Sequence, residues 1–329
     1  MAATAYRVGF VVVGEDFQSD QDVTGRIWTS IDGTSWEIAT GPGGVFSSSE
    51  VDQVAVAGQR AVAFGEARSG EMASAPQRIL WLSDDGRSWR RIAAGAAVLE
   101  TIKVGGLAST GSGFVVWGET ASGSPTIATS TDGETWATSD IAAQFPDAVV
   151  ASVAVGGGVW VAVGSKRSAT PAVGGPARPA EAFVSTDGQR WSAASVDGPA
   201  LTRVVSGSDG FLAEGASQCG SCVGPGNIWH SDDGRTWRLV GPDATTSASY
   251  ASDGVRIVRL GLDGGVSLDW STDGLTWQPL ASGLAAHSEY GAFAVGPNGV
   301  LLLENPSGLG NGTGGLDDAD AGVWYVRPG

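Results

Sequence analysis

The segment WSTDGLTW, residues 270–277, has five near-copies along the chain: WTSIDGTSW, WLSDDGRSW, ATSTDGETW, FVSTDGQRW and WHSDDGRTW. Their common pattern is Ser-x-Asp-Gly-x-x-Trp. An Asp that opens a tight turn can accept hydrogen bonds from the next backbone N–H groups, and Gly adopts a positive φ angle at little cost. The pattern therefore predicts six structural turns of one design, formed by Ser30, Asp32, Gly33, Trp36, Ser83, Asp85, Gly86, Trp89, Ser130, Asp132, Gly133, Trp136, Ser185, Asp187, Gly188, Trp191, Ser231, Asp233, Gly234, Trp237, Ser271, Asp273, Gly274 and Trp277.

Two further apolar runs precede each motif, such as GFVVVGE at 9–15 in the first repeat. Successive motif Trp residues are 53, 47, 55, 46 and 40 residues apart. A repeat thus reads as strand A, a short turn, strand B, a variable loop, strand C, the Asp turn and strand D, with the Trp in strand D. Four short strands in about 40 to 50 residues are typical of a β-propeller blade.

Residues 289–306 and 322–329 supply three strands of a further repeat that lacks the Asp turn. We therefore expect an all-β chain that forms one β-propeller domain over residues 1–329. Seven blades of four antiparallel strands are favoured, with six as the alternative. In such a blade the A–B and C–D turns share one face, and the B–C loops share the other face with the D–A connections.

These six motifs resemble the Asp-box, or BNR, repeats of sialidase-like β-propellers, and the resemblance covers nearly the whole chain. The usual family pattern is Ser-x-Asp-x-Gly-x-Thr-Trp, whereas every copy here is one residue shorter between Asp and Trp. The resemblance implies that the turns lie on the face opposite the family's active site. It therefore agrees with a structural role for the motifs.

The charge of the chain limits the kinds of partner. The formal net charge is -16 and the sequence pI is about 4.4. Nucleic acids and anionic membranes require a basic face, so we expect neither as a partner. No apolar run approaches the roughly 18 residues of a membrane span, and we expect no membrane insertion. The amino terminus enters strand-like sequence at once, without the features of a secretory signal.

Cys219 and Cys222 are the two cysteines and form the segment CGSC within a loop-like stretch. A turn can bring the side chains of residues i and i+3 within bridging distance, which predicts a local disulfide. A redox pair would be expected at a helix start, and a zinc site needs about four ligands, whereas the chain contains only two His. The disulfide favours an extracellular or cell-envelope location.

The B–C loops vary in length and sequence, and we expect function on their face because binding residues concentrate in variable loops on a rigid scaffold. The loops of the first and last repeats are acidic and become neighbours when the ring closes. Carboxylates gathered in this way predict a possible calcium site, with no other cofactor required. The candidate ligands are Asp16, Asp20, Asp22, Asp317, Asp318 and Asp320.

We expect a monomeric, non-catalytic binding or scaffold module that recognises a protein or a glycan. The alternative is a glycoside hydrolase of the sialidase type, for which the resemblance implies an arginine triad, a Tyr–Glu nucleophile and an Asp acid/base. The inner strands offer few cations, namely Lys103, Arg203 and Arg7, and Glu289 and Tyr290 are adjacent, so they point to opposite faces of a strand.

Other enzymatic residues are equally scarce. His230 and His287 are expected to be structural, and the chain has no G-x-S-x-G, H-E-x-x-H or phosphate-binding loop motif. A pair of carboxylates about 5 to 9 Å apart would be enough to hydrolyse a neutral glycan. The sequence does not select such a pair, so no residue is assigned as catalytic.

Overall fold

The computed structural model describes residues 1–6, 9–19, 22–67, 78–92, 99, 101–167, 178–215, 226–242, 248–261, 266–284, 290–304 and 323–326. Almost all of the regular structure in these residues is β-strand. One short helix, α2 (Ile141–Gln144), lies between two strands. None of the helical structure described is long and apolar enough to cross a membrane.

In chain order the strands fall into groups. The first three groups are β1 (Ala2–Tyr6), β2 (Gly9–Ser19), β3 (Asp22–Ser30) and β4 (Glu37–Ile38); β5 (Ser49–Ala57), β6 (Arg60–Ala67), β7 (Arg78–Ser83) and β8 (Arg90–Arg91); and β9 (Ile102–Ser109), β10 (Phe114–Thr120), β11 (Pro125–Ser130) and β12 (Ala137–Thr138). The next two are β13 (Ala148–Gly156), β14 (Val159–Lys166), β15 (Ala180–Ser185) and β16 (Ser192–Ala193); and β17 (Leu201–Gly207), β18 (Gly210–Gly215), β19 (Asn227–Ser231) and β20 (Arg238–Pro242). The last two are β21 (Ala248–Ser252), β22 (Ile257–Gly261), β23 (Val266–Ser271) and β24 (Gln278–Leu284); and β25 (Tyr290–Gly296), β26 (Gly299–Glu304) and β27 (Val323–Val326).

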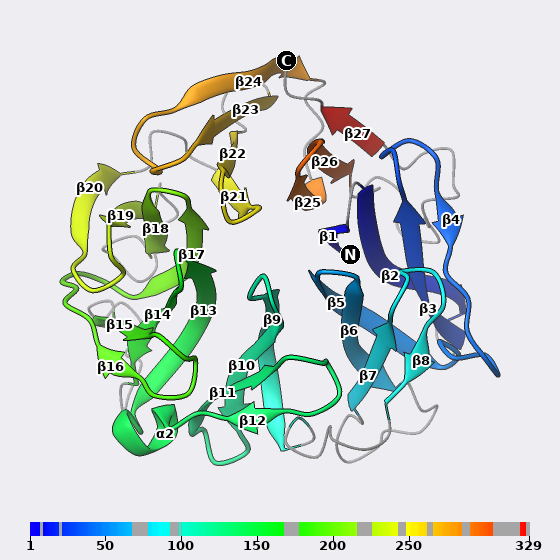
Figure 1. Ribbon diagram of the computed structural model, residues 1–329, viewed down its shortest axis with the longest axis horizontal. Coiled ribbons are helices and arrows are strands. Elements are labelled where there is room, and N and C mark those ends of the chain that lie inside the picture. The colour runs from blue at the N-terminus through cyan, green and yellow to red at the C-terminus, as the bar shows by residue number, and fades with distance from the viewer. Residues whose placement is uncertain are drawn as a thin grey trace.

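Within each group, consecutive strands pair antiparallel in the order in which they occur in the chain. A single parallel bridge, Thr24 to Ser49, joins the first two groups into one eight-stranded sheet. Figure 1 shows the groups arranged around a central opening, with the first strand of each group near the centre and the last at the periphery. The predicted all-β architecture of four-stranded antiparallel sheets is therefore confirmed, apart from the three-stranded last group.

The hydrophobic core lies between neighbouring groups rather than within one sheet. Second strands are buried on both faces, which explains their continuous apolar sequence: Val11, Val12 and Val13 in β2 are fully buried. Separate apolar clusters connect each group to the next. One of them joins Val12 and Trp28 of the first group to Leu301 and Leu303 of the last and so closes the ring.

The ring closes through side chains alone in the part of the chain that the structure describes. β1 pairs only with β2, and β25, β26 and β27 pair with one another, so that no strand is shared between the first and last groups. The ring of Phe10 meets that of Tyr325 edge to face, with 5.7 Å between centroids. We call this interface between β1–β4 and β25–β27 the seam.

Candidate functional site

The six Asp turns share one hydrogen-bond pattern. In the third group, Asp132 Oδ1 accepts hydrogen bonds from the backbone N–H groups of Glu134 (2.8 Å) and Thr135 (2.7 Å). The Ser130 hydroxyl donates to the same carboxylate (3.0 Å) and accepts from the N–H of Gly133 (2.8 Å). Each of the other Asp residues accepts from the N–H groups two and three positions later in the same way.

These hydrogen bonds favour the charged carboxylate. The N–H groups of Thr135 and then Glu134 lower the pKa of Asp132, and the corresponding donors act in the same direction in all six turns. Partial burial alone would raise the pKa of Asp273, but the N–H groups of Thr276 and Leu275 outweigh it and lower the pKa to about 2. The carboxylates are therefore anionic structural acceptors at neutral pH.

The Gly of each turn has a positive φ, for example 73° at Gly133. It also packs closely: a Cβ on Gly133 would lie 2.6 Å from Val62 Cγ2 and 2.8 Å from Leu82 Cδ1, both in the preceding group. At the seam, a Cβ on Gly33 would lie 2.7 Å from the ring of Tyr325. At these junctions the turn therefore closes its own hairpin and also contacts the neighbouring group.

The motif Trp residues lie one position before the outer strand, not inside it as the strand reading predicted. The indole folds back on its own turn, and Nε1 donates to the Gly carbonyl three residues earlier in the turns of Trp89, Trp136, Trp191 and Trp237, at 3.0–3.3 Å. Those four side chains are buried. Trp36 and Trp277 are partly buried, and the guanidinium of Arg259 lies 4.5 Å from the Trp277 ring centroid.

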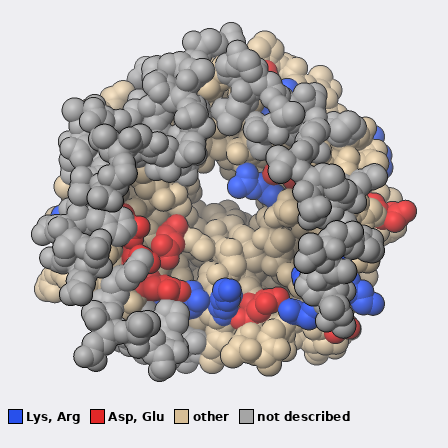
Figure 2. Space-filling model, turned by 180° about the vertical axis from the view of Figure 1, so that it is seen from behind, with Lys and Arg blue, Asp and Glu red and all other residues tan. Residues whose placement is uncertain are grey.

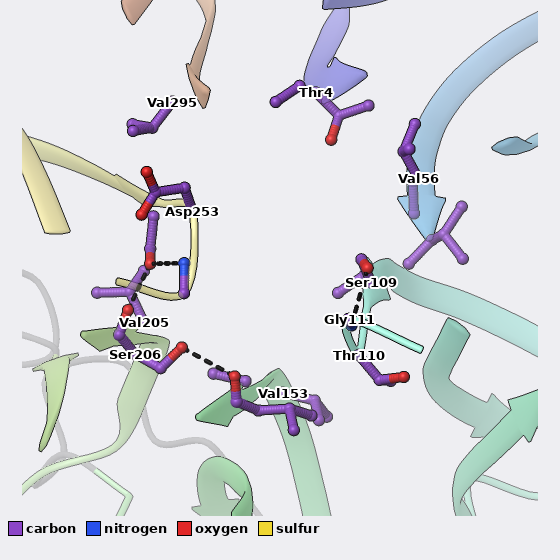
Figure 3. Close-up of a pocket in the computed structure, with 18 of the residues that line it drawn as sticks. Thr4, Val56, Ser109, Thr110, Gly111, Val153, Val205, Ser206, Asp253 and Val295 are labelled. Atoms are coloured by element: carbon purple, nitrogen blue, oxygen red, sulfur yellow. Dashed lines mark hydrogen bonds between the residues drawn. The ribbon is translucent and has the colours of Figure 1, made fainter. Parts of the chain in front are cut away.

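A cavity of about 680 Å³ occupies the central opening at the end where the A–B turns lie. Because every group runs up and down in the same order, the Asp turns lie at this end too, which we call the Asp-turn end. Figure 3 shows residues from several inner strands and their turns facing the cavity, among them Thr4, Val56, Ser109, Val153 and Ser206.

Two hydroxyl groups in this cavity donate to nearby backbone carbonyls. The Ser206 hydroxyl donates to the Val155 carbonyl (3.0 Å), and Ser252 donates to the Ser206 carbonyl. Asp253 is the only ionisable residue among the described residues that line the cavity, and Arg256 Nη2 lies 2.9 Å from its Oδ2. The cavity wall therefore presents small apolar groups and little unneutralised charge.

The opposite end of the strands, where the B–C loops begin, is strongly charged. Figure 2 views the molecule from behind and shows acidic and basic side chains around the central opening. Three ion pairs link neighbouring strands or groups at this end, which we call the loop end: Glu66–Arg78 (3.2 Å), Glu119–Arg167 and Glu214–Arg203 (3.9 Å).

One part of the loop end gathers negative charge. Partial burial, and then the charges of Glu15 and Glu66, raise the pKa of Asp52, although its side chain keeps contact with solvent. Burial also raises the pKa of Glu181, with Asp147 adding to the effect and Lys166 opposing it. The described residues contain no group of three or more His, Cys, Asp or Glu suited to hold a metal ion.

Several residues singled out in the sequence lie outside this description. Cys219, Cys222, Asp20, Asp317, Asp318 and Asp320 are not described, nor are Arg7, His287 and Glu289, and only the backbone is described at Asp16, Asp22 and Tyr290. The disulfide and the calcium site therefore stay predictions. The B–C loop of the third group, residues 121–124, is described, whereas much or all of the others lies outside the described residues, at 20–21, 68–77, 168–177, 216–225, 262–265 and 305–322.

Three further candidates, Lys103, Arg203 and His230, are described, and Lys103 is exposed on β9. Arg203 donates to the Tyr250 carbonyl (3.1 Å) besides its contact with Glu214. His230 is fully buried beside Arg238, and burial followed by that charge lowers its pKa. Sequence reasoning missed the cavity at the Asp-turn end because it looked for variable loops. The signal available was the recurrence of small residues and short turns at the ends of the inner strands.

Comparison with known proteins gives the fold alone. No family model matches the chain, and no curated protein matches it. Among solved structures, the β-propeller domain of the Trilobed protease from Pyrococcus furiosus, which has an open velcro topology, aligns at 13% identity with a TM-score of 0.60, covering 92% of this chain and 90% of that one. The fold is a β-propeller.

Two other structures align over part of their length. Pyrococcus horikoshii acylaminoacyl peptidase has 10% identity and a TM-score of 0.56 over 92% of this chain and 48% of that chain. Trypanosoma rangeli sialidase has 14% identity and a TM-score of 0.46 over 99% of this chain and 54% of that chain. The propeller described here thus spans about half of each of these two proteins.

Proposed function

We propose that this chain is a seven-bladed, non-catalytic β-propeller of the Asp-box type, which binds a protein partner with a basic surface at its loop end. The groups β1–β4 to β25–β27 are then the seven blades. The observation that carries the proposal is the gathering of Glu15, Asp52 and Glu66, where partial burial and then these like charges raise the pKa of Asp52, although Arg78, which pairs with Glu66, opposes them. A cationic partner would relieve this repulsion.

The Asp-turn end supports the proposal by contrast. The carboxylates of its six motif Asp residues accept local backbone hydrogen bonds, as at Asp132, and the ionisable residue that lines its cavity, Asp253, pairs with Arg256. The net charge of -16 also favours a basic partner and would increase the rate of its association. A glycan is the other class of ligand for the same face.

The test uses labelled Lys-rich and Glu-rich peptides and a glycan array as probes. We expect the Lys-rich peptide to bind, and its affinity to fall as salt is raised from about 20 to 200 mM, because salt screens exposed charges. The double variant Asp52→Asn/Glu15→Gln should weaken this binding. A matched control, Asp209→Asn/Asp232→Asn, removes two exposed charges at the Asp-turn end and should leave it unchanged.

Equal weakening by the two double variants would show that only net charge matters and would contradict a site at the loop end. Glycan binding without peptide binding would indicate that the ligand of this face is a glycan and not a protein. Absence of both would reject the binding function as stated.

A glycoside hydrolase is the second candidate, and one observation favours it. Burial raises the pKa of Glu181 at the loop end, and a general acid needs a raised pKa. Hydrolysis of glycan substrates that is lost in Glu181→Gln but kept in Asp209→Asn would establish this activity. From the sequence we also keep, as proposals, the Cys219–Cys222 disulfide, calcium binding by the acidic loops and an extracellular or cell-envelope location.

A further inference from the structure

The residue just before the motif Ser is ionisable in the fifth group, β17–β20, and in none of the other five motif copies. There it is His230, whereas the equivalent residues are Thr29, Leu82, Thr129, Val184 and Trp270. The His230 side chain is 1% exposed. A side chain that can take up a proton near neutral pH is therefore buried at a repeat position that is uncharged elsewhere.

The hydrogen bond of His230 fixes the protonation state of its imidazole. Nδ1 lies 3.3 Å from Nη2 of Arg238, which is opposite His230 in the outer strand β20. A guanidinium has donors only, so Nδ1 must be the acceptor, and the imidazole is neutral with its proton on Nε2. That Nε2 is buried without a hydrogen-bond partner in the described residues, and the Asp232 carboxylate lies 3.8 Å away. A second proton could enter only at Nδ1, where it would face the guanidinium.

The imidazole lies beside the turn that joins the fifth group to the sixth, β21–β24, its neighbour in the ring (Figure 1). A Cβ on Gly210 would lie 3.1 Å from His230 Nε2. The backbone N–H groups of residues 208 and 209 donate to the carbonyls of Val255 and Thr272 in the sixth group, at 2.9 and 3.2 Å. A displacement of the imidazole would therefore reach the bonds between the two groups.

The surroundings of His230 act on its proton in two directions. Burial, and then the charge of Arg238, lower the pKa of the imidazole below its ordinary value of 6.5. Asp232, in the turn after β19, and Asp273, in the turn of the sixth group, oppose this shift, the latter by its charge and its backbone. Because the net shift is downward, stability is complete above pH 6.5 and is lost as the pH falls toward the folded-state pKa.

We propose that His230 makes the junction between the fifth and sixth groups an acid-sensitive switch. One proton from solvent binds Nδ1 and turns this acceptor into a donor, so the hydrogen bond from Arg238 breaks and two cations face each other at a buried site. Their separation loosens the turn at 208–210 and its bonds to the sixth group. Since Ser206 and Ser252 of this junction line the central cavity, acidification also changes part of the cavity wall.

The first test compares the wild type with His230→Leu, because Leu82 fills the equivalent position in the second group. Urea denaturation gives the unfolding equilibrium constant at about pH 7.5 and about pH 5. On acidification it should rise about tenfold more in the wild type than in His230→Leu, because only the wild type takes up this proton on unfolding. His287→Gln removes the only other histidine and should respond like the wild type. Equal responses of the wild type and His230→Leu would overturn the proposal.

Amide hydrogen exchange separates a local switch from a general effect of acid. After correction for the intrinsic pH dependence of exchange, the amides at 208–210 should exchange about tenfold faster at the lower pH in the wild type. The amides of Thr40 and Trp89, which hold the junction between the first two groups through bonds of 2.8 Å, should not. Equal acceleration at the two junctions would contradict the switch.

Nitrogen NMR of the imidazole needs no variant and applies even if His230→Leu does not fold. In the wild type near neutral pH the proton should lie on Nε2, and the pKa of His230 should be below 6.5. Arg238→Gln, which removes the facing charge, should raise this pKa. A neutral imidazole with its proton on Nδ1, or a pKa above 6.5, would overturn the proposal.

Discussion

The two ends of the propeller are built from the same strands and use their residues in opposite ways. At the Asp-turn end, one set of hydrogen bonds recurs from group to group, and the six motif Asp residues accept from local backbone donors. At the loop end, equivalent positions differ: Glu15, Glu66 and Glu119 follow a Gly at the end of the second strand, whereas the fourth group has Ser165. Repetition marks structure here, and variation marks the surface available for recognition.

The inner strands show this difference at single positions. Several of them carry a β-bulge near the loop end, at Asp52, Gly105, Ala151 and Thr202. The backbone irregularity recurs because it bends each inner strand in the same way. The side chain at the bulge differs among the groups: it is a carboxylate at Asp52, absent at Gly105, a methyl group at Ala151 and a hydroxyl at Thr202. The same backbone therefore places different chemical groups around the opening.

The largest expected effect tests whether the Asp turns are structural contacts between groups. Gly133→Ala places a Cβ at a positive φ of 73° and 2.6 Å from Val62. We expect a loss of about 2–4 kcal/mol in unfolding free energy from backbone strain and overpacking together, measured by urea denaturation. Gly111→Ala is the control, since its φ is 82° but a Cβ there meets nothing within 4 Å. Equal losses would show that packing on the preceding group is unimportant.

The next effect concerns the carboxylate of one turn. Asp132→Ala removes the acceptor of two backbone N–H groups and should cost about 1–3 kcal/mol at pH 7. Asp147→Ala, an exposed residue at the loop end, should change stability by less than about 0.5 kcal/mol. Similar losses in the two variants would argue that the turn carboxylate is no more than a surface charge.

The pH dependence sharpens the same comparison. The Thr135 and Glu134 N–H groups lower the pKa of Asp132 below its usual value of 3.8, so its stabilising effect is complete above that value and is lost as pH falls through the folded-state pKa. The difference in unfolding free energy between wild type and Asp132→Ala should therefore shrink below about pH 4. A constant difference between pH 7 and pH 3 would contradict the charge-assisted hydrogen bonds.

The smallest effect has the opposite sign and belongs to the loop end. Partial burial and the charges of Glu15 and Glu66 raise the pKa of Asp52, so its charged form is unfavourable in the folded state. Asp52→Asn should therefore raise stability at pH 7 by a few tenths, about 0.2–0.5 kcal/mol after solvent screening, seen as a higher melting temperature. Asp209→Asn at the other end should not. A destabilised Asp52→Asn protein would show that Asp52 supports the fold.

Local chemistry explains which features could be predicted from the sequence. The Asp turns need only contacts within five residues, so the pattern around Asp132 identified them, as the apolar runs identified the strand groups. The position of the Trp was wrong by one residue, and in four turns the indole bonds to a Gly carbonyl of its own turn, as Trp136 does to Gly133, which competes with strand extension. Three features depend on which groups become neighbours: the cavity, the charge cluster at Asp52, and the buried Trp28 Nε1, which has no hydrogen-bond partner among the described residues. No single position in the sequence determines which groups are neighbours.

The ring closes where Phe10 and Gly33 contact Tyr325, and this closure affects which rearrangements of the gene the fold can accept. Every group is a contiguous stretch, and no strand crosses the seam in the described structure. Circular permutation by a whole group would therefore leave every antiparallel sheet covalently intact and would only move the gap to another junction. Duplication or deletion of a group would likewise break no antiparallel strand pair, and the fit of side chains at the gap would decide whether the new ring closes.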